Sequence, residues 1–305
     1  YDKTRIAGPM VRKSYLEWVQ NGYKGSNKPE LRGRDEWVQV SWDTALGLTA
    51  KAILDTIEKH GNEGCFSSSY GGWSHAGIFR PNVLQGRFFN LLGGSSVTTG
   101  DYSAGAGQIL LPMVIGDMEV YSPQTAWEQL RDNTELVVFI GCDPDKNNRI
   151  EYTVCDHEMY SGWDAIKQAG CQFISIDPQV TTTDEKMGSE WVRIVPNTDT
   201  ALFMAMGYHL LSQNKHNQAF IDKYTVGFDK YRAHLEGKDG SAPKTPEWAE
   251  KITGIPAAKI RALAELMASK RTQLFAPWAV PPAHHGSMPY WAIVNFASIL
   301  GNIGP

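Results

Sequence analysis

The stretch that decides the fold reads Leu136-Val137-Val138-Phe139-Ile140-Gly141, a continuous apolar run that ends in a glycine. A strand buried on both faces of a sheet has this composition, because neither face presents polar side chains to water. Two more short apolar runs follow at residues 173–176 and 191–195, and helical patterns at 160–169 and 200–211 follow the first and third runs. This alternation predicts an α/β fold with a parallel sheet, right-handed crossovers and helices on both faces.

Polar side chains follow the three runs, at the ends where parallel sheets bind ligands. The first run is followed by Asp143, Lys146, Asn147 and Asn148, the second by Asp177, Pro178 and three threonines (181–183), and the third by Asn197 and Asp199. Carboxylates and amides suit the hydroxyls and base edges of a nucleotide, and a lysine suits a phosphate. The pattern indicates a Rossmann-like nucleotide-binding domain, although plain turns and helix caps use the same residues. No GxGxxG motif follows a run, which disfavours an ordinary nicotinamide site.

A second region, residues 66–107, is rich in glycine, serine and aromatic residues. Small side chains let the backbone approach a ligand closely, and the interleaved phenylalanines and leucines argue against a flexible linker. An amphipathic pattern before it predicts a helix over 41–60. We expect three regions: a metal-site region with flanking helices at 1–130, the α/β nucleotide-binding domain at 131–270, and the start of a further, truncated α/β segment at 271–305.

The composition excludes several classes of protein. The formal net charge of −4 favours neither nucleic acid nor an anionic membrane as a partner. No run of about 20 apolar residues is present, so we expect no membrane-spanning helix. The four cysteines, Cys65, Cys142, Cys155 and Cys171, lack zinc or iron–sulfur spacing and are typical of small buried hydrophobic residues.

Several short motifs occur in an order that resembles one known family of enzymes. They are Tyr70-Gly71-Gly72-Trp73, Gly100-Asp101-Tyr102-Ser103, Glu119-Val120-Tyr121, Gln124-Thr125-Ala126-Trp127, Ile176-Asp177-Pro178, Asn197-Thr198-Asp199 and Lys244-Thr245-Pro246-Glu247-Trp248-Ala249. Each motif is weak alone, but their order resembles that of the dimethyl sulfoxide reductase family of bis(molybdopterin guanine dinucleotide) enzymes. The chain is most similar to the central portion of trimethylamine N-oxide, methionine sulfoxide and biotin sulfoxide reductases.

The resemblance implies that Ser103 is the molybdenum ligand. An alkoxide oxygen is a hard donor, which suits a high-valent molybdenum as a hard acceptor. Trp73 and Tyr121 would donate hydrogen bonds to the oxygen that is transferred, and Tyr152 would form a wall of the substrate funnel. Taken without the resemblance, the same residues fit an N-capping or nucleophilic serine and ordinary core aromatic residues.

The turn near residue 280 also belongs to the resemblance. Trp278 and His284 would contact the guanine dinucleotides, together with Lys146, Asn147, Asn148, Asp177, Pro178, Asn197 and Asp199. The turn departs from the family pattern, because Pro277 stands where relatives have glycine and Pro282 stands where they carry an arginine. The adjacent prolines Pro281 and Pro282 stiffen the turn and remove backbone donors, so we expect this departure to alter specificity or to abolish activity.

The resemblance implies molybdenum-dependent oxygen-atom transfer, in which an S-oxide or N-oxide is reduced by two electrons. Candidate substrates are trimethylamine N-oxide and dimethyl, methionine and biotin sulfoxides, as in anaerobic respiration. The cofactors would be molybdenum and bis(molybdopterin guanine dinucleotide), with no iron–sulfur cluster in this segment. The electron donor would be external, such as a c-type cytochrome, and the location would be the bacterial periplasm, reached by a signal upstream of residue 1.

Two other interpretations stay open. One is a catalytically incomplete pterin- or nucleotide-binding fragment, or a subunit that needs a partner chain, because relatives are longer at both ends. The other is a hydrolase that uses Ser103, which would need a histidine and an acid within reach. We expect the 305 residues to be part of a longer gene product.

Overall fold

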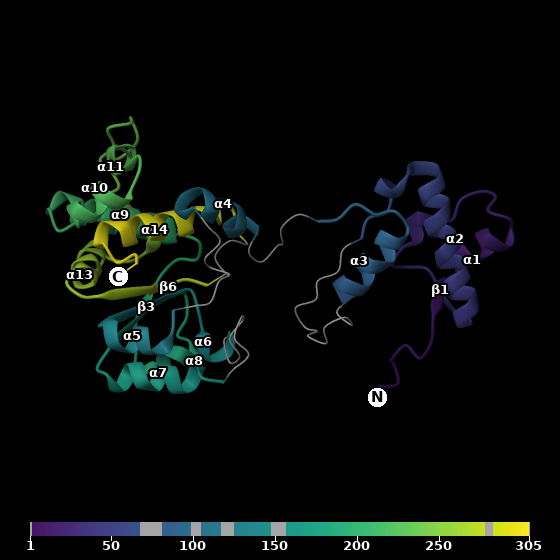
Figure 1. The fold of residues 1–305 in the computed structure, drawn as a ribbon, viewed down its shortest axis with the longest axis horizontal. Coiled ribbons are helices and arrows are strands. Elements are labelled where there is room, and N and C mark those ends of the chain that lie inside the picture. Colours follow the sequence, from purple (N-terminus) through teal and green to yellow (C-terminus); the bar gives the residue numbers. More distant parts are fainter. Residues whose placement is uncertain are drawn as a thin grey trace. The chain divides into compact units, whose positions relative to one another are not determined.

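The computed structural model describes residues 2–67, 81–98, 105–116, 125–147, 157–277 and 283–304. They fall into two compact units, Tyr1–Thr99 and Gly100–Pro305, drawn in Figure 1. The expected boundaries at residues 130 and 270 do not coincide with the boundary between these units. Residues 272–275, which we expected to begin a separate segment, pair with residues 136–139 and so belong to the sheet of the second unit.

The first unit is built around one long helix. Its elements are the antiparallel strands β1 (Met10–Arg12) and β2 (Trp37–Gln39), the helices α1 (Lys13–Gln20), α2 (Trp42–His60) and α3 (Pro81–Leu91), and the short 3-10 helices η1 (Pro29–Leu31) and η2 (Asn62–Gly64). The side chain of Ser41 caps α2 by accepting a hydrogen bond from the amide of Thr44 at 3.2 Å, which confirms the helix predicted over 41–60. Among the described residues of this unit, only Ser14, Cys65 and Ser67 are buried.

The second unit contains a four-stranded parallel sheet. Its strands are β3 (Leu136–Ile140), β4 (Gln172–Asp177), β5 (Glu190–Arg193) and β6 (Thr272–Phe275), in the order β5-β4-β3-β6. Both faces of β3 are covered: Leu136, Val138 and Ile140 pack into one hydrophobic cluster and Val137 and Phe139 into another. Because both faces of β3 are buried, every residue of this strand is apolar. The predicted parallel α/β fold is confirmed.

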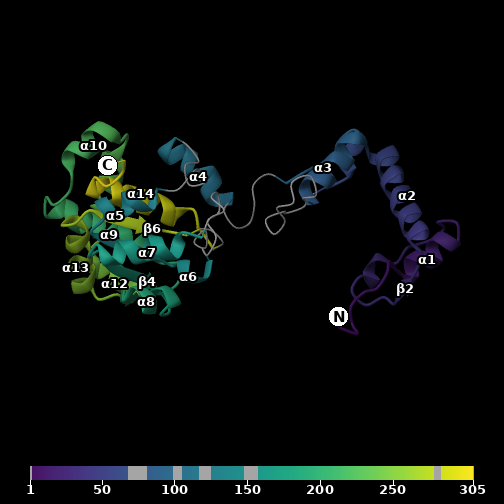
Figure 2. The ribbon, with the colours of Figure 1, turned by 60° about the horizontal axis from the view of Figure 1, so that its bottom comes forward.

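Helices cover both faces of this sheet, as Figures 1 and 2 show. One hydrophobic cluster joins the sheet to α9 (Asp199–Ser212), α12 (Pro246–Thr253), α13 (Ala257–Ala268) and α14 (Met288–Leu300), and the other joins it to α5 (Trp127–Asn133), α7 (Met159–Gln168) and α8 (Thr182–Met187). The unit also contains α4 (Gly105–Ile115), α6 (Pro144–Asn147), α10 (Gln218–Tyr224) and α11 (Phe228–Leu235). Among the described helices, none combines the length and apolar character that crossing a membrane would require.

Aromatic rings fill the face covered by α5 and α7. The ring centroid of Trp163 lies 5.1 Å from that of Trp127 and 5.2 Å from that of Phe139. Gly162 lies directly beneath Trp127, where an added Cβ atom would come within 2.2 Å of ring atom Cδ2. The absence of a side chain at Gly162 therefore lets the indole ring rest on α7 and brings α5 close to the sheet.

Candidate functional site

The carboxyl edge of the parallel sheet is the candidate site. The first strand of the four-stranded sheet along the chain, β3, has β4 on one side and β6 on the other, so the connections run in opposite directions from it. In open parallel sheets, ligands bind outside the carboxyl ends of the strands at such a switch point. The Sγ atom of Cys142 donates a hydrogen bond to the carbonyl oxygen of Phe275 at 3.5 Å, so the ends of β3 and β6 are adjacent.

Asp177, the last residue of β4, has a buried carboxyl group with a surface exposure of 7%. Its Oδ1 atom accepts a hydrogen bond from the amide of Gln179 at 3.0 Å, and its carbonyl oxygen accepts one from Nε1 of Trp191 at 2.9 Å. Burial raises the pKa of the Asp177 carboxyl, and the negative charges of Asp184 and Asp143 add to this rise against the opposing effect of the Gln179 amide. Among the residues that the structure describes, the carboxyl accepts only the Gln179 hydrogen bond, so it has acceptor capacity left for a ligand.

The loop after β5 brings two more predicted residues to this edge. Asn197 has a left-handed backbone conformation with φ of 63°, which asparagine tolerates better than most residues. Its side-chain amide donates a hydrogen bond to the carbonyl oxygen of His284 at 3.2 Å. Asp199 begins α9; burial raises the pKa of its carboxyl, and the negative charge of Asp177 contributes to that rise. The structure thus brings Asp177 close to Asp199, and Asn197 into contact with the segment that contains His284.

The remaining described candidates are exposed. Lys146, in α6, has a side chain that is 58% exposed, and its Nζ atom lies 3.3 Å from Oδ2 of Asp143. Three further candidates are also exposed to solvent: Asn147, Pro178 and His284. Lys146 therefore places a cation beside the Asp143 carboxylate, and its exposure leaves it free to change partners.

The three threonines after β4 are engaged within the protein. Thr181 caps α8: its hydroxyl accepts from the amide of Asp184 at 3.2 Å, and the Asp184 carboxylate accepts from the amide of Thr181 at 2.8 Å. Thr182 and Thr183 bind the carboxylate of Asp143 instead of facing a ligand. The sequence held a signal for this arrangement, because a threonine followed three residues later by an acidic residue is typical of a capping box.

Six predicted residues lie outside the described part of the chain. They are Trp73, Ser103, Tyr121, Asn148, Tyr152 and Trp278. Their roles stay predictions from the resemblance in sequence. Among the residues that the structure describes, no group of three or more histidine, cysteine, aspartate or glutamate side chains could hold a metal ion.

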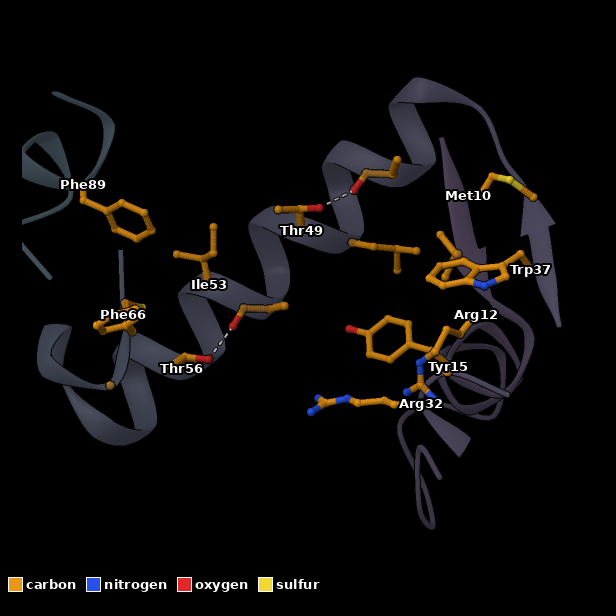
Figure 3. A pocket seen from close by; sticks show the side chains of 17 residues that line it. Met10, Arg12, Tyr15, Arg32, Trp37, Thr49, Ile53, Thr56, Phe66 and Phe89 are labelled. Atoms are coloured by element: carbon orange, nitrogen blue, oxygen red, sulfur yellow. Dashed lines mark hydrogen bonds between the residues drawn. The ribbon is translucent and has the colours of Figure 1, made fainter. Parts of the chain in front are cut away.

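The first unit contains an apolar cavity of about 750 Å³ between α1, β1 and α2. Figure 3 shows Tyr15 and Arg32 extending across it toward the α2 residues Ile53 and Thr56. Arg12, at its margin, is engaged elsewhere, since its guanidinium pairs with the carboxylate of Asp35 at 3.3 Å. No predicted site residue lines this cavity, so we assign the candidate site to the sheet edge.

Comparison with known proteins gives a consistent picture. The model of the molybdopterin oxidoreductase family matches residues 5–305. The chain is 42% identical, over 100% of its length, to a dimethyl sulfoxide/trimethylamine N-oxide reductase from Rhodobacter capsulatus and 38% identical to a trimethylamine-N-oxide reductase from Haemophilus influenzae. It spans 36% of the length of each of these curated relatives.

A solved structure supports the same fold. Acetylene hydratase from Pelobacter acetylenicus superposes with a TM-score of 0.59 over 88% of this chain and 34% of that one, at 20% sequence identity. This likeness concerns the fold alone. Because the family model covers almost the whole sequence and a relative is 42% identical along it, the chain belongs to the molybdopterin oxidoreductase family.

Proposed function

We propose that this chain binds the guanine dinucleotide of a molybdopterin cofactor at the carboxyl edge of its sheet, as part of an oxidoreductase that acts on S-oxides or N-oxides. The observation that carries the proposal is the pair of carboxyls at that edge, Asp177 from β4 and Asp199 from α9. Burial raises the pKa of both carboxyls, and the negative charge of Asp177 adds to the rise at Asp199. Membership of the family implies molybdenum and molybdopterin as the cofactor.

The hydrogen-bonding groups at the edge fit a nucleotide. The Asp177 carboxyl accepts a hydrogen bond from the amide of Gln179, and both carboxyls are buried enough for their pKa values to be raised. Ribose hydroxyls and the N–H groups of guanine are donors, so they can use the remaining lone pairs. Donors that bind the ionised form would also lower both pKa values again, and Lys146 supplies a cation for a phosphate.

The metal site that we propose rests on the sequence. Ser103 would hold the molybdenum, which, when bound with its pterins, supplies two-electron oxygen-atom transfer. The indole N–H of Trp73 and the hydroxyl of Tyr121 would donate hydrogen bonds to the substrate oxygen and stabilise the charge that builds on it. Tyr152 would form a wall of the funnel and orient the substrate. The protein's contribution is thus position, hydrogen bonds and exclusion of water.

The substrate proposal follows the names of two relatives, a dimethyl sulfoxide/trimethylamine N-oxide reductase and a trimethylamine-N-oxide reductase. We propose trimethylamine N-oxide or a sulfoxide as the substrate of the whole enzyme. We further propose an external electron donor such as a c-type cytochrome, a periplasmic location and a role in anaerobic respiration. No iron–sulfur cluster is proposed for this segment, because its four cysteines lack the spacing.

The experiment measures metal and nucleotide together. Molybdenum is determined by elemental analysis and guanine by release in acid, from wild type, a Ser103→Ala variant and a Ser161→Ala control. Ser161 is an exposed α7 serine whose hydroxyl donates to the carbonyl oxygen of Glu158 at 2.9 Å.

We expect about one molybdenum and about two guanines per wild-type chain, loss of metal with retention of guanine in Ser103→Ala, and no change in the control. Wild-type protein that holds neither would refute the proposal. Guanine without metal in wild type would instead support the incomplete nucleotide-binding fragment.

A further inference from the structure

We propose that Asp143 is the positioning residue of the nucleotide-binding edge: it ties the loop after β3 to the start of α8 and so fixes the loop that carries Asp177. This inference rests on the proposed nucleotide site and adds a residue that does not touch the ligand. Asp143 follows β3, whereas its partners follow β4, 39 and 40 residues later in the chain.

The carboxylate of Asp143 is surrounded by donors from two threonines. Its Oδ1 atom accepts hydrogen bonds from the hydroxyl of Thr183 at 2.6 Å, the amide of Thr183 at 3.1 Å and the hydroxyl of Thr182 at 3.0 Å. Its Oδ2 atom accepts one from the amide of Thr182 at 3.3 Å and shares the hydroxyl of Thr182, which lies 3.0 Å from it. Burial alone would raise the pKa of the Asp143 carboxyl, but these hydrogen bonds outweigh it and the pKa lies below its usual value. The charged form is therefore the one that holds the two loops.

A second contact joins the same two segments. The amide of Asp145, in α6, donates a hydrogen bond to the hydroxyl of Thr183 at 3.0 Å. The Thr183 hydroxyl thus receives one bond from the β3 loop and gives one to it, while its side chain is almost fully buried at 2% exposure. Only four residues separate Asp177 from Thr182, so anchoring the threonines also restricts the path of the chain at Asp177.

Asp143 also holds a cation that the edge can offer to a phosphate. The Nζ atom of Lys146 lies 3.3 Å from Oδ2 of Asp143, in an ion pair whose lysine is 58% exposed. Such an exposed pair is weak, and the hydrogen bonds from Thr182 and Thr183 keep the carboxylate satisfied after the lysine leaves. The arrangement keeps Lys146 at the edge in the free protein and lets it move to an anionic ligand at little cost.

The test measures binding of guanosine diphosphate, as a probe, by calorimetric titration of the cofactor-free protein. Asp143→Asn replaces one carboxylate oxygen by a donor that faces the Thr182 amide, and Thr183→Val removes the shared hydroxyl. We expect each to weaken binding about tenfold, because a charged hydrogen bond that orders the site is lost. The double variant should be weaker by less than the product of the two single effects, since both variants loosen the same cluster around the Asp143 carboxylate, and Thr183→Ser should restore wild-type affinity.

The control is Asp132→Asn, which removes an equal charge from an exposed carboxylate that pairs with Arg131 in α5. Its affinity should match wild type. If Asp177→Asn weakens binding while Asp143→Asn and Thr183→Val do not, or if Asp143→Asn tightens binding by freeing Lys146, the positioning role is wrong and the nucleotide site stands. If wild type does not bind the probe, the proposed nucleotide site is refuted and this inference with it.

Discussion

The substitution Asp177→Asn separates the binding role of the carboxyl from its cost to the fold. The asparagine keeps an oxygen to accept the hydrogen bond from the Gln179 amide, now 3.0 Å away, so the turn after β4 should persist. The second oxygen becomes an amide donor, which cannot accept from a ribose hydroxyl or a guanine N–H. Hydrogen bonds to charged groups contribute about 1.5–3 kcal/mol, so nucleotide affinity should fall by about 10- to 150-fold.

The stability of the nucleotide-free protein should change in the opposite direction. The folded-state pKa of Asp177 is raised above its unfolded value, chiefly by burial. Folding therefore favours the protonated carboxyl, and the stability that this group contributes at low pH is lost as pH rises through the folded pKa. At pH 7 the asparagine lacks this cost, so we expect Asp177→Asn to unfold at a higher temperature than wild type. The difference should shrink as pH falls toward the usual range of an aspartate.

Two assays check this pair of opposite effects. Guanosine diphosphate titration gives the affinity, and scanning calorimetry of the cofactor-free protein at pH 7 and pH 4 gives the unfolding temperature. A change of about 1 kcal/mol shifts this temperature by about 2–4 °C in a unit of this size, which is readily measured. Unchanged affinity would remove Asp177 from the site. A loss of both affinity and stability at pH 7 would mean that the carboxylate is a structural group and that our reading of its burial is wrong.

Three further predictions concern the scaffold of the edge. Gly162→Ala should lower the unfolding temperature, because overpacking against Trp127 costs about 1–3 kcal/mol and exceeds the gain of about 1 kcal/mol in helix propensity. Adding Trp127→Leu should recover part of the loss. An unchanged unfolding temperature in the single variant would contradict the contact between Gly162 and Trp127. Thr181→Ala should cost about 1 kcal/mol of unfolding free energy, with Thr181→Ser near wild type in the same denaturant titration. Burial raises the pKa of the Cys142 thiol to about 12, so iodoacetamide at pH 8 should leave this thiol unmodified in the folded protein. In denaturant the same reagent should alkylate it, which mass analysis of the peptides would show. Fast labelling of the folded protein would contradict the burial of Cys142.

Local sequence pattern was sufficient for the elements of the sheet. The run Leu136–Ile140 is apolar on both faces, and this property follows from composition alone, so the strand and its place inside a parallel sheet were predictable. The same reasoning found the helix over 41–60 through its cap and its periodicity. Asp177 and Asp199 were also found as candidates, because carboxylates in the segments that leave the strands of a parallel sheet lie at its carboxyl edge.

What the tertiary structure alone decided is which polar groups are available to a ligand. Thr182 and Thr183 looked as suitable for a nucleotide as Asp177 did, but Asp143, 39 and 40 residues away, uses them. Likewise the place of β6 beside β3 follows from pairing across more than 130 residues. Apolar periodicity is a local property that each segment carries by itself. A hydrogen bond between two loops forms only if the strands that carry them are neighbours in the sheet, and that order of strands is established only when both faces of β3 are packed.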